Sequence, residues 1–573
     1  MKVQRALISV FNKSGVESFA KGLTDLGVQV ISTGGTARLL KDSGIPVTLV
    51  EEVTGFPEML DGRVKTMHPR LMAGILANRD VPEHMDTIKE HGIEPVDMVV
   101  CSLYPFEEVA GRRGVTDEVV IENIDIGGPS MIRAAAKNHA GVAVVTSHED
   151  YEPLLAELRD TGELSYPTLR ELATKAFHRT AHYDFVIANW FSEDEGDFPS
   201  YVLRDYHKVL ELKYGENPHQ RAAYYAEVGL RQHLLSQVTQ LHGKQLGFNN
   251  LYDLNAARAI CDEFTLPCVV IIKHNNPCGV ACADTIQQAY ENAYFADRIA
   301  AMGGCIVLNR TLDVGCARAI ADQYAEVVAA PEYEEGAVEI LRARENLRII
   351  RIPALAELEK IVGTPFLDIK SLVDGGLIIQ ASFRNRILTE DDFLPAEAIK
   401  DGTTYLARKP SRREAEDLLF AWAVEAGVTS NSIIFARDGA TVSIGTGEQD
   451  RVGCVELTIQ KAYTKYADRL AFERHNLSLY ELKLKAKTDA ELAASLEEIL
   501  KKTDADRGGL PGTVLVSDGF FPFRDGVDLA VAQGVTAIAQ PGGSIRDWEI
   551  IQAVNSATSQ VAMVFTGQRS FKH

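Results

Sequence analysis

The sequence predicts an α/β protein that begins with a doubly wound parallel sheet. Two observations carry this prediction: short apolar runs alternate with amphipathic helical segments from the N-terminus onward, and polar or glycine-rich turns follow the apolar runs. A second series of such runs begins after an acidic stretch, EDEGDFPS, at residues 193–200. With 573 residues, the chain has room for three or four structural units.

Five apolar runs in the first block predict strands, at residues 6–10, 28–31, 47–50, 96–103 and 141–145. Amphipathic spacing predicts helices at residues 15–26 and 37–41 between the first three of them. Ligands of doubly wound sheets bind beyond the carboxyl ends of the strands. We therefore expect functional side chains directly after these runs.

Polar residues do follow the first two strands. Ser9, Asn12 and Lys13 lie at or just after the end of the first, and the stretch STGGT (residues 32–36) follows the second. A Gly-Gly turn that enters a helix presents backbone N–H groups and the positive end of the helix dipole, which suits a phosphate group. An ordinary strand-to-helix turn is the alternative, and the P-loop is excluded because no Gly-Lys-Ser/Thr follows.

The loop GFPEMLDGRVKTMHP carries Arg63, Lys65, Thr66 and His68. Solvation alone would explain such charges. However, loops that hold several cations and hydroxyls in an acidic protein are often ligand-binding. We favour the binding interpretation.

A second Gly-Gly turn, in IDIGGPSMIRAAAKNHA, follows Asp125. The helix after it carries Arg133 and Lys137 four residues apart, which puts both cations on one face. That face could simply be solvated. A lysine whose pKa is lowered by neighbouring cations or by burial could instead move protons near neutral pH.

The second block opens with a turn-rich stretch, KYGENPHQ, and later a buried strand at residues 268–272. That strand leads directly into Lys273 and His274, a catalytic type of location. The alternative is a satisfied core histidine beside a lysine that reaches solvent. His274, Cys278 and Cys282 resemble a zinc site only faintly, because zinc deaminases need H-x-E and P-C-x-x-C, and neither pattern is present. No metal is expected.

Further elements complete the second block. We expect a strand at residues 305–308, a helix at 411–427, a hairpin around Asp438-Gly439 and a peripheral helical segment at 475–510. Two comparable α/β arrangements are visible, without a repeat strong enough to demonstrate from sequence.

Composition excludes several classes of protein. Hydrophobic residues make up 46% and charged residues 24%, which is ordinary for a globular protein. The formal net charge of −21 disfavours nucleic-acid or anionic membrane partners. The eight scattered cysteines indicate no disulfide framework and fit a reducing cytoplasm. The N-terminal apolar stretch is too short for a signal peptide, and no apolar run approaches the ~18 residues of a membrane span.

At this density of motifs the sequence resembles the bifunctional purine-biosynthesis family of AICAR transformylase/IMP cyclohydrolase. The motifs are ISTGGT, GFPEMLDGRVKTMHP, LYPF, IDIGGPSMIRAAAKNHA, YGENPHQ, KHNNPCG, SNSI, GTGEQDR and DGFFPFRDGVD, in the family's order along nearly the whole chain. The resemblance implies a methylglyoxal-synthase-like N-terminal domain and a C-terminal half of two cytidine-deaminase-like units without zinc. It places the cyclohydrolase and a helical connector in residues 1–195 and the transformylase in residues 200–573.

The implied reactions are consecutive. A formyl group passes from 10-formyltetrahydrofolate, a cosubstrate, to the amine of aminoimidazole carboxamide ribonucleotide. The product then closes to inosine monophosphate with loss of water. No prosthetic group is implied, and the family's transformylase sites lie between the subunits of a homodimer.

The resemblance also implies site residues. Lys273 and His274 would be catalytic in the transformylase, and Lys137, Asp125 and Lys65 in the cyclohydrolase. Nucleotide contacts in the cyclohydrolase would come from Ser9, Phe11, Asn12, Lys13, Thr33, Gly34, Gly35, Thr36, Arg63, Val64, Lys65, Thr66, Cys101, Ser102, Tyr104, Asp125 and Ile126. Those in the transformylase would come from Lys213, Tyr214, His274, Gly303, Glu326, Asn431, Phe520 and Arg569. Folate contacts would come from Arg451, Val452, Pro522, Asp525, Gly542 and Gly543.

Two other functions remain open for the N-terminal domain. It could be a methylglyoxal-synthase-like lyase or a phosphate-effector module without catalysis. The chain also departs from the family pattern: Lys213 replaces an expected Arg and loses its bidentate grip on phosphate, Phe11 replaces a small hydroxyl residue, and Met302 replaces an aromatic one.

Overall fold

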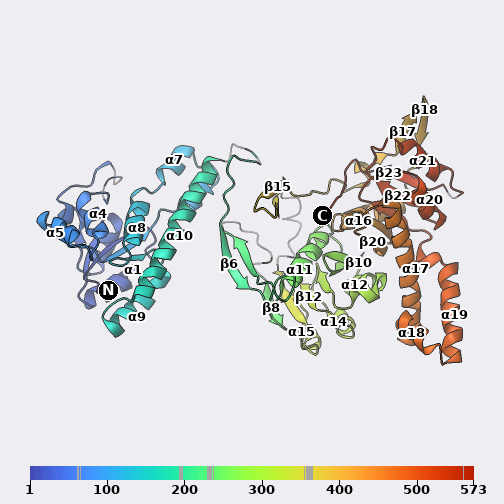
Figure 1. The fold of residues 1–573 in the computed structure, drawn as a ribbon, viewed down its shortest axis with the longest axis horizontal. Helices are drawn as coiled ribbons and strands as arrows, with labels where there is room; N and C mark the ends of the chain where they lie inside the picture. Colours follow the sequence, from blue (N-terminus) through green and yellow to red (C-terminus); the bar gives the residue numbers. More distant parts are fainter. Residues whose placement is uncertain are drawn as a thin grey trace. The chain divides into compact units, whose positions relative to one another are not determined.

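The computed structural model describes residues 1–60, 64, 66–192, 196, 198–228, 235, 238–353, 355, 366–558 and 560–573. Residues 193–195 and 197 of the expected linker lie outside these ranges. The chain forms two compact units, Met1–Asp205 and Tyr206–His573 (Figure 1). No helix in the described ranges is both long enough and apolar enough to cross a membrane.

The first unit is built on a parallel sheet in the order β3-β2-β1-β4-β5. Its strands are β1 (Arg5–Val10), β2 (Gln29–Ser32), β3 (Thr48–Leu49), β4 (Met98–Ser102) and β5 (Ala143–Val145). The predicted doubly wound sheet is therefore confirmed. The strand expected at residues 47–50 is shorter, because Val50 begins a helix whose Glu52 carboxylate accepts the Leu49 N–H at 3.3 Å.

Helices cover both faces of this sheet. They are α1 (Val16–Asp25), α2 (Gly34–Asp42), α3 (Val50–Thr54), α4 (Pro69–Leu76), α5 (Pro82–Glu90), α6 (Phe106–Ala110), α7 (Asp117–Glu122), α8 (Gly127–Lys137), α9 (Tyr151–Thr161) and α10 (Tyr166–Phe191). The long helix α10 starts where the Ser165 hydroxyl accepts the Thr168 N–H, and it packs along α8 (Figure 1). Its buried face, which includes Leu169, Leu172 and Tyr183, joins the core of the unit.

In the described part of the second unit, twelve strands form one mixed sheet in the order β16-β23-β22-β21-β19-β20-β10-β9-β11-β12-β13-β8. In that order the bounds are Leu394–Pro395, Ala562–Phe565, Ala537–Gln540, Val514–Ser517, Ile433–Arg437, Ala440–Gly445, Asn276–Cys282, Cys268–Lys273, Cys305–Leu308, Val327–Ala330, Arg348–Arg351 and Thr239–His242. Three two-stranded sheets flank it: β6 (Tyr206–Glu211) with β7 (Ala223–Glu227), β14 (Leu367–Ser371) with β15 (Leu377–Ala381), and β17 (Glu397–Lys400) with β18 (Thr403–Leu406).

The centre of this sheet is an internal duplication. Each copy has an antiparallel hairpin, β9–β10 or β19–β20, followed by three mutually parallel strands, β11–β13 or β21–β23. A helix precedes each hairpin, α11 (Phe248–Cys261) or α16 (Arg412–Glu425), and another follows it, α12 (Ile286–Ala296) or α17 (Arg451–His475). The copies join where β10 pairs with β20. The structure thus demonstrates the repeat that the sequence only indicated.

The remaining helices of the second unit are α13 (Arg298–Ala301), α14 (Val314–Ala321), α15 (Ala337–Leu341), α18 (Leu479–Lys485), α19 (Ala490–Ala505), α20 (Asp525–Ala532) and α21 (Asp547–Asn555). The expected helical segment at 475–510 is confirmed as α18 and α19, which lie beside α17 (Figure 1). The sequence pattern did not predict α17, because its buried face consists of small and polar residues such as Cys454, Thr458 and Ala462.

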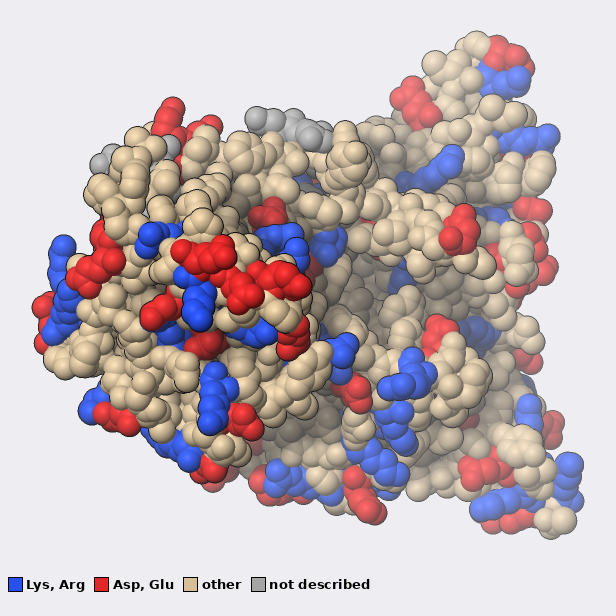
Figure 2. Space-filling model, turned by 60° about the vertical axis from the view of Figure 1, so that its left-hand side comes forward, with Lys and Arg blue, Asp and Glu red and all other residues tan. Residues whose placement is uncertain are grey.

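Acidic and basic side chains are interspersed on the surface. On the face seen in Figure 2, Lys and Arg alternate with Asp and Glu and form no continuous basic tract. Phosphate groups must therefore be bound through local arrangements of donors, as the net charge of −21 predicts.

Candidate functional site

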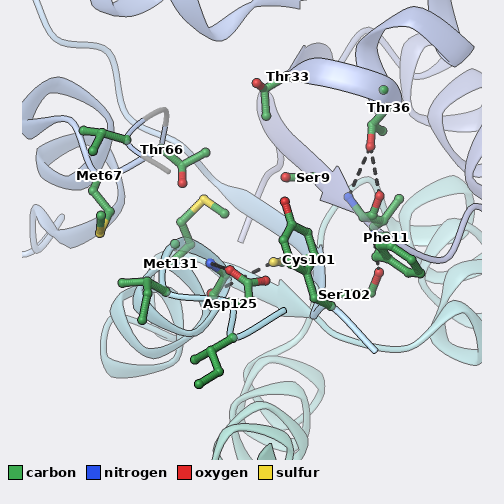
Figure 3. A pocket seen from close by; sticks show the side chains of 18 of the residues that line it. Ser9, Phe11, Thr33, Thr36, Thr66, Met67, Cys101, Ser102, Asp125 and Met131 are labelled. Atoms are coloured by element: carbon green, nitrogen blue, oxygen red, sulfur yellow. Dashed lines mark hydrogen bonds between the residues drawn. The ribbon is translucent and has the colours of Figure 1, made fainter. Parts of the chain in front are cut away.

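A cavity of about 740 Å³ lies at the carboxyl ends of β1, β2 and β4 in the first unit (Figure 3). The predicted residues that line it are Ser9, Phe11, Lys13, Thr33, Gly35, Thr36, Val64, Thr66, Cys101, Ser102, Tyr104, Asp125 and Ile126. These residues come from five separate segments of sequence. The tertiary structure therefore gathers them at the edge of the sheet where doubly wound proteins bind ligands.

Four predicted nucleotide contacts are not among the described residues that line the cavity. Arg63 and Lys65 lie outside the described residues. Asn12 and Gly34 are neighbours of lining residues and do not line the cavity themselves. Conversely, the wall includes apolar residues that the sequence did not single out: Val10, Leu60, Met67, Ile121, Ile124 and Met131.

One end of the cavity is suited to a phosphate. Thr33 precedes the first turn of α2 without capping it, so the N–H groups of that turn are not used by the Thr33 hydroxyl. The Thr33 Oγ1 is itself buried and has no hydrogen-bond partner among the described residues. Nearby, Lys13 Nζ donates to Thr36 Oγ1 at 2.7 Å, and Thr36 Oγ1 donates to the Val10 carbonyl oxygen at 3.0 Å. The cation is thus held at the end of β1.

Asp125 lies at the opposite wall, held by the glycine pair that starts α8. Its Oδ1 accepts the Gly128 N–H at 2.8 Å. A Cβ at Gly128 would come within 2.4 Å of Asp125 Oδ2, and a Cβ at Gly127 within 2.7 Å of Thr66 Oγ1. Both glycines are therefore required for the close approach of these two polar side chains to the helix.

Cys101 is fully buried at the back of this wall, and the side chains of Cys101 and Asp125 lie close together in Figure 3. Burial, with the nearby Asp125 carboxylate, raises the pKa of the Cys101 thiol far above its ordinary value. The thiol is therefore not a nucleophile at neutral pH and contributes shape to the cavity.

A tyrosine that no sequence motif indicated holds the backbone of Asp125 in place. Tyr183 lies on α10, 58 residues further along the chain, and its hydroxyl accepts the Asp125 N–H at 2.8 Å while donating to the Asn123 carbonyl at 3.2 Å. Its pKa is raised to about 12 by burial. No local motif marks Tyr183, because its role depends on how α10 packs on α8.

Lys137 is not brought into the cavity. It is the exposed last residue of α8, whose first residue, Gly127, lines the cavity. Ten residues of helix separate the two by about 15 Å at 1.5 Å per residue. Within one chain, Lys137 and Asp125 therefore lie at opposite ends of α8.

In the second unit, Lys273 and His274 lie at the tip of the β9–β10 hairpin. Lys273 ends β9, and its Nζ donates to the Met302 carbonyl at 2.9 Å. His274 is exposed in the turn. Asn276 anchors the start of β10, because its Oδ1 accepts the Thr429 N–H and the Thr446 hydroxyl, each at 2.9 Å. The tip is thus tied to the loops that begin and end the second hairpin.

The other predicted nucleotide residues of this unit lie on the neighbouring loops. Gly303, with φ of +79°, donates its N–H to the Tyr324 carbonyl at 2.7 Å. Glu326 directly precedes β12, and its carboxylate accepts a hydrogen bond from Asn250 Nδ2 at 3.3 Å. Lys213 Nζ lies 5.3 Å from the centroid of the Tyr214 ring. Arg569 lies over the Phe520 ring at 5.2 Å.

Arg451, predicted as a folate contact, is buried in a polar network. Its guanidinium pairs with Asp518 Oδ1 and donates to Asn431 Oδ1 at 2.7 Å. Glu425 completes the network, accepting the Ser432 hydroxyl at 2.6 Å, and its burial beside Asp518 raises its pKa well above the ordinary value. The Arg451 side chain thereby fixes Asn431.

The remaining predicted folate residues lie where β21 and β22 end. Pro522 and Asp525 follow β21, and Gly542 and Gly543 follow β22. Both glycines have left-handed φ, +72° and +88°, and the Gly543 N–H is bound by Asp547 Oδ2 at 2.8 Å. Val452 lies in the first turn of α17. No group of three His, Cys, Asp or Glu side chains in the described ranges could hold a metal ion.

Family comparisons identify both parts of the chain. A model described as "MGS-like domain" matches residues 15–130, and one described as "AICARFT/IMPCHase bienzyme" matches residues 135–461. A solved structure entitled "Crystal structure of ForH" matches 33% of this chain and 97% of its own, with 35% sequence identity and a TM-score of 0.30.

Several relatives match over the full length of both chains. Proteins named "Bifunctional purine biosynthesis protein PurH" from Magnetococcus marinus, a Thermoanaerobacter species and Listeria welshimeri are 44%, 43% and 41% identical, with 100% of each chain covered.

Proposed function

Because the chain belongs to the AICAR transformylase/IMP cyclohydrolase family, we propose that its two units divide the two reactions between them. Residues 1–195 would carry the cyclohydrolase, with α10 as the helical connector, and residues 200–573 the transformylase. The chain itself is a bifunctional enzyme of purine biosynthesis that performs the final steps to inosine monophosphate. The full-length identity of 44% to a PurH protein is the observation that carries this function.

Formyl transfer is assigned to the tip of the β9–β10 hairpin. The amine of the ribonucleotide attacks the formyl carbon of 10-formyltetrahydrofolate, a C–N bond forms, and the carbonyl oxygen becomes an oxyanion. His274 accepts the amine proton and the Lys273 ammonium stabilises the oxyanion. Collapse of this intermediate expels N10 of the folate, which leaves with a proton. The exposure of His274 and the fixed position of Lys273 support these roles.

The loops around that hairpin would hold the two substrates. Lys213, Tyr214, Gly303, Glu326, Asn431, Phe520 and Arg569 are proposed to bind the nucleotide. Val452, Pro522, Asp525, Gly542, Gly543 and, through its hold on Asn431, Arg451 are proposed for the folate side. Four of the proposed folate residues follow the carboxyl ends of two adjacent parallel strands, which supports a ligand role: Pro522 and Asp525 after β21, and Gly542 and Gly543 after β22.

Ring closure is assigned to the cavity of the first unit. The carboxamide nitrogen attacks the formyl carbon and loses a proton, and the hydroxyl formed there leaves as water. Asp125 is proposed to hold the carboxamide N–H, while Lys13, Thr33 and the first turn of α2 bind the phosphate. Arg63 and Lys65 are proposed to add positive charge from their loop.

Lys137 is proposed to shuttle the proton in ring closure, acting in the cavity of a second copy of the chain. Its exposure at the far end of α8 supports this arrangement, since it is distant from its own Asp125. A homodimer is further supported by exposed apolar side chains around the β14–β15 hairpin, with Phe366, Leu377 and Ile378 each more than half exposed.

We further propose that 10-formyltetrahydrofolate is the cosubstrate, that no prosthetic group is used, and that the enzyme acts in the cytoplasm. The duplicated pattern of the second unit, a helix, a hairpin, a helix and three parallel strands, supports a pair of cytidine-deaminase-like units. The eight reduced cysteines support a reducing compartment.

The test is to incubate the full chain with the formylated ribonucleotide and follow inosine monophosphate. If the chain forms inosine monophosphate and Asp125→Asn abolishes this activity, the result supports the cyclohydrolase. The Asn amide oxygen can still accept the Gly128 N–H, so the substitution removes the negative charge and keeps this hydrogen bond. Binding without turnover would favour a phosphate-effector module. Release of methylglyoxal from dihydroxyacetone phosphate would favour the lyase.

A further inference from the structure

The β9–β10 hairpin that carries His274 is closed by a two-residue turn of an unfavourable kind for its sequence. Lys273 pairs with Asn276, and the two residues between them, His274 and Asn275, have φ of +55° and +62°. Such a type I′ turn needs left-handed φ at both central positions, which glycine and asparagine adopt easily and histidine does not. Something outside the turn must therefore hold it.

Asp253 is the outside group. It lies on α11, and its Oδ1 accepts the Asn275 N–H at 2.7 Å. The backbone N–H of His274 also donates to this carboxylate, and the His274 imidazole interacts with it electrostatically. One carboxylate thus binds both N–H groups that the turn points away from its strands.

In the second copy of the duplicated fold, an aspartate on the preceding helix binds a hairpin turn in the same way. Asp417 is the sixth residue of α16, as Asp253 is the sixth residue of α11. Its carboxylate accepts the Gly439 N–H at 3.1 Å and also the Asp438 N–H, in the β19–β20 turn, where φ is +53° and +70°. There the second position is glycine, and the turn carries no imidazole.

We propose that Asp253 is a positioning residue of the transformylase, which fixes the His274 turn and stabilises the imidazolium formed when His274 accepts the amine proton. The inference rests on the proposed role of His274. The duplication separates the two proposed roles of Asp253, which are to hold the turn and to stabilise the imidazolium. Both aspartates hold a turn, but only Asp253 holds one that bears a proton acceptor.

Other charged groups share the neighbourhood of the Asp253 carboxyl. Burial raises its pKa, as does Glu326, which directly precedes β12, whereas the Asn275 and His274 N–H donors and the His274 imidazole lower it. Lys273, the residue before His274, places a positive charge beside the turn. The thiols Cys278 and Cys305 interact electrostatically with Asp253, and burial raises the pKa of both, so they stay neutral. Of these groups, the Asp253 carboxylate is the one that binds the His274 turn and interacts with its imidazole.

The test compares Asp253→Ala, Asp253→Asn and the matched control Asp417→Ala in the full chain. We expect Asp253→Ala to lower transformylase kcat by about 10²-fold with KM for both substrates within about threefold. Asp253→Asn should lose less, because its amide oxygen still accepts N–H groups. The acid limb of the pH–rate profile of Asp253→Asn should move to lower pH, because the neutral amide no longer stabilises the imidazolium and His274 stays unprotonated to a lower pH. Asp417→Ala should keep kcat within about threefold, and cyclohydrolase activity should be unchanged in all three.

A rescue variant separates positioning from folding. Asn275→Gly places the preferred glycine at the second central position, as in the Asp438-Gly439 turn, so Asp253→Ala/Asn275→Gly should recover part of the lost kcat while its pH profile stays shifted. Equal losses in the Asp253 and Asp417 variants, or kcat within threefold of the parent in Asp253→Ala, would overturn the inference. His274→Ala with full transformylase activity would instead remove the proposed function on which it rests.

Discussion

The Tyr183 hydroxyl binds the backbone N–H of Asp125 at 2.8 Å, across 58 residues of sequence. The same hydroxyl donates to the Asn123 carbonyl, so one side chain of α10 holds both ends of the turn that precedes α8. The loop bearing the proposed cyclohydrolase carboxylate is therefore positioned by a helix whose sequence shows only a core pattern.

Tyr183→Phe removes the hydroxyl and keeps the ring. We expect cyclohydrolase kcat to fall about tenfold, because the Asp125 N–H loses its partner and the loop gains freedom, at a cost of about 1–3 kcal/mol for an unpaired buried group. Transformylase activity in the same protein is the internal control. Unchanged cyclohydrolase kinetics would mean that the Gly128 hydrogen bond alone holds Asp125.

His274→Ala should lower transformylase kcat by about 10²-fold or more and leave nucleotide affinity nearly unchanged, since the imidazole is proposed to act on a proton and not on binding. Steady-state kinetics of both reactions and nucleotide titration provide the measurement. Parallel loss of both activities would indicate misfolding or a shared site.

Lys137→Ala should abolish ring closure while formyl transfer continues and the formylated intermediate accumulates. Lys137→Arg should also fail, because a guanidinium keeps its proton at neutral pH. An active Arg variant would mean that the residue supplies only positive charge.

The position of Lys137 allows a sharper version of that experiment. If the lysine acts in the cavity of a second copy, mixing Lys137→Ala with Asp125→Asn subunits should restore cyclohydrolase activity, since each mixed dimer holds one intact pair. About a quarter of the parent activity is expected after random exchange of equal amounts, because half of the dimers are mixed and each holds one intact site of two. No recovery, with exchange verified by mass, would place both residues in one chain's site.

The first unit should fold without the second unit and, as a dimer in which each copy supplies Lys137 to the other, cyclise the formylated ribonucleotide without folate. Fragment 1–205 should melt about 2–4 °C above fragment 1–195, because Asp205 Oδ2 binds His182 Nδ1 at 2.7 Å on α10 and the shorter fragment lacks this contact. Differential scanning calorimetry of both fragments measures the difference. Equal melting temperatures would remove Asp205 from the folded unit.

Glu425→Gln should make stability less dependent on pH. The folded-state pKa of this buried carboxyl lies well above its ordinary value, so the folded protein retains a proton that the unfolded chain releases above about pH 4.3. Wild-type stability therefore falls as pH rises, and the advantage of the Gln variant should grow by up to about 1.4 kcal/mol for each pH unit.

Glu414, on the same helix, is the matched control with the opposite sign. Its pKa is lowered to about 2, through hydrogen bonds from Arg408 and Ser411 that outweigh burial. Its contribution is present above about pH 4.3 and is lost as pH falls toward 2, so Glu414→Gln should cost stability at neutral pH only. Urea unfolding between pH 3 and 8 measures both variants. Parallel curves for Glu425→Gln and wild type would contradict the first expectation.

Much of the first site could be predicted because strand ends can be read from apolar runs. Ser9 lies at the end of β1 and Thr33 and Thr36 follow β2, and parallel strands bring those ends to one edge. Asp125 was marked instead by the Gly-Gly turn that starts α8. In the second unit, the apolar run at 268–272 correctly marked β9. The hairpin that follows it, in place of a helix, was not evident, because a His-Asn pair is an unusual type I′ turn.

By itself, the sequence determined the class of the fold and the family, and it marked the segments that hold the proposed site residues, since periodicity and motifs are local properties of the chain. Only the tertiary structure decided which side chains meet. Tyr183 reaches Asp125, and Asp253 reaches the His274 turn, because packed helices bring distant residues together. Lys137 is carried away from Asp125 for the same physical reason: a helix has a fixed rise per residue, so residues at its two ends cannot share one cavity wall.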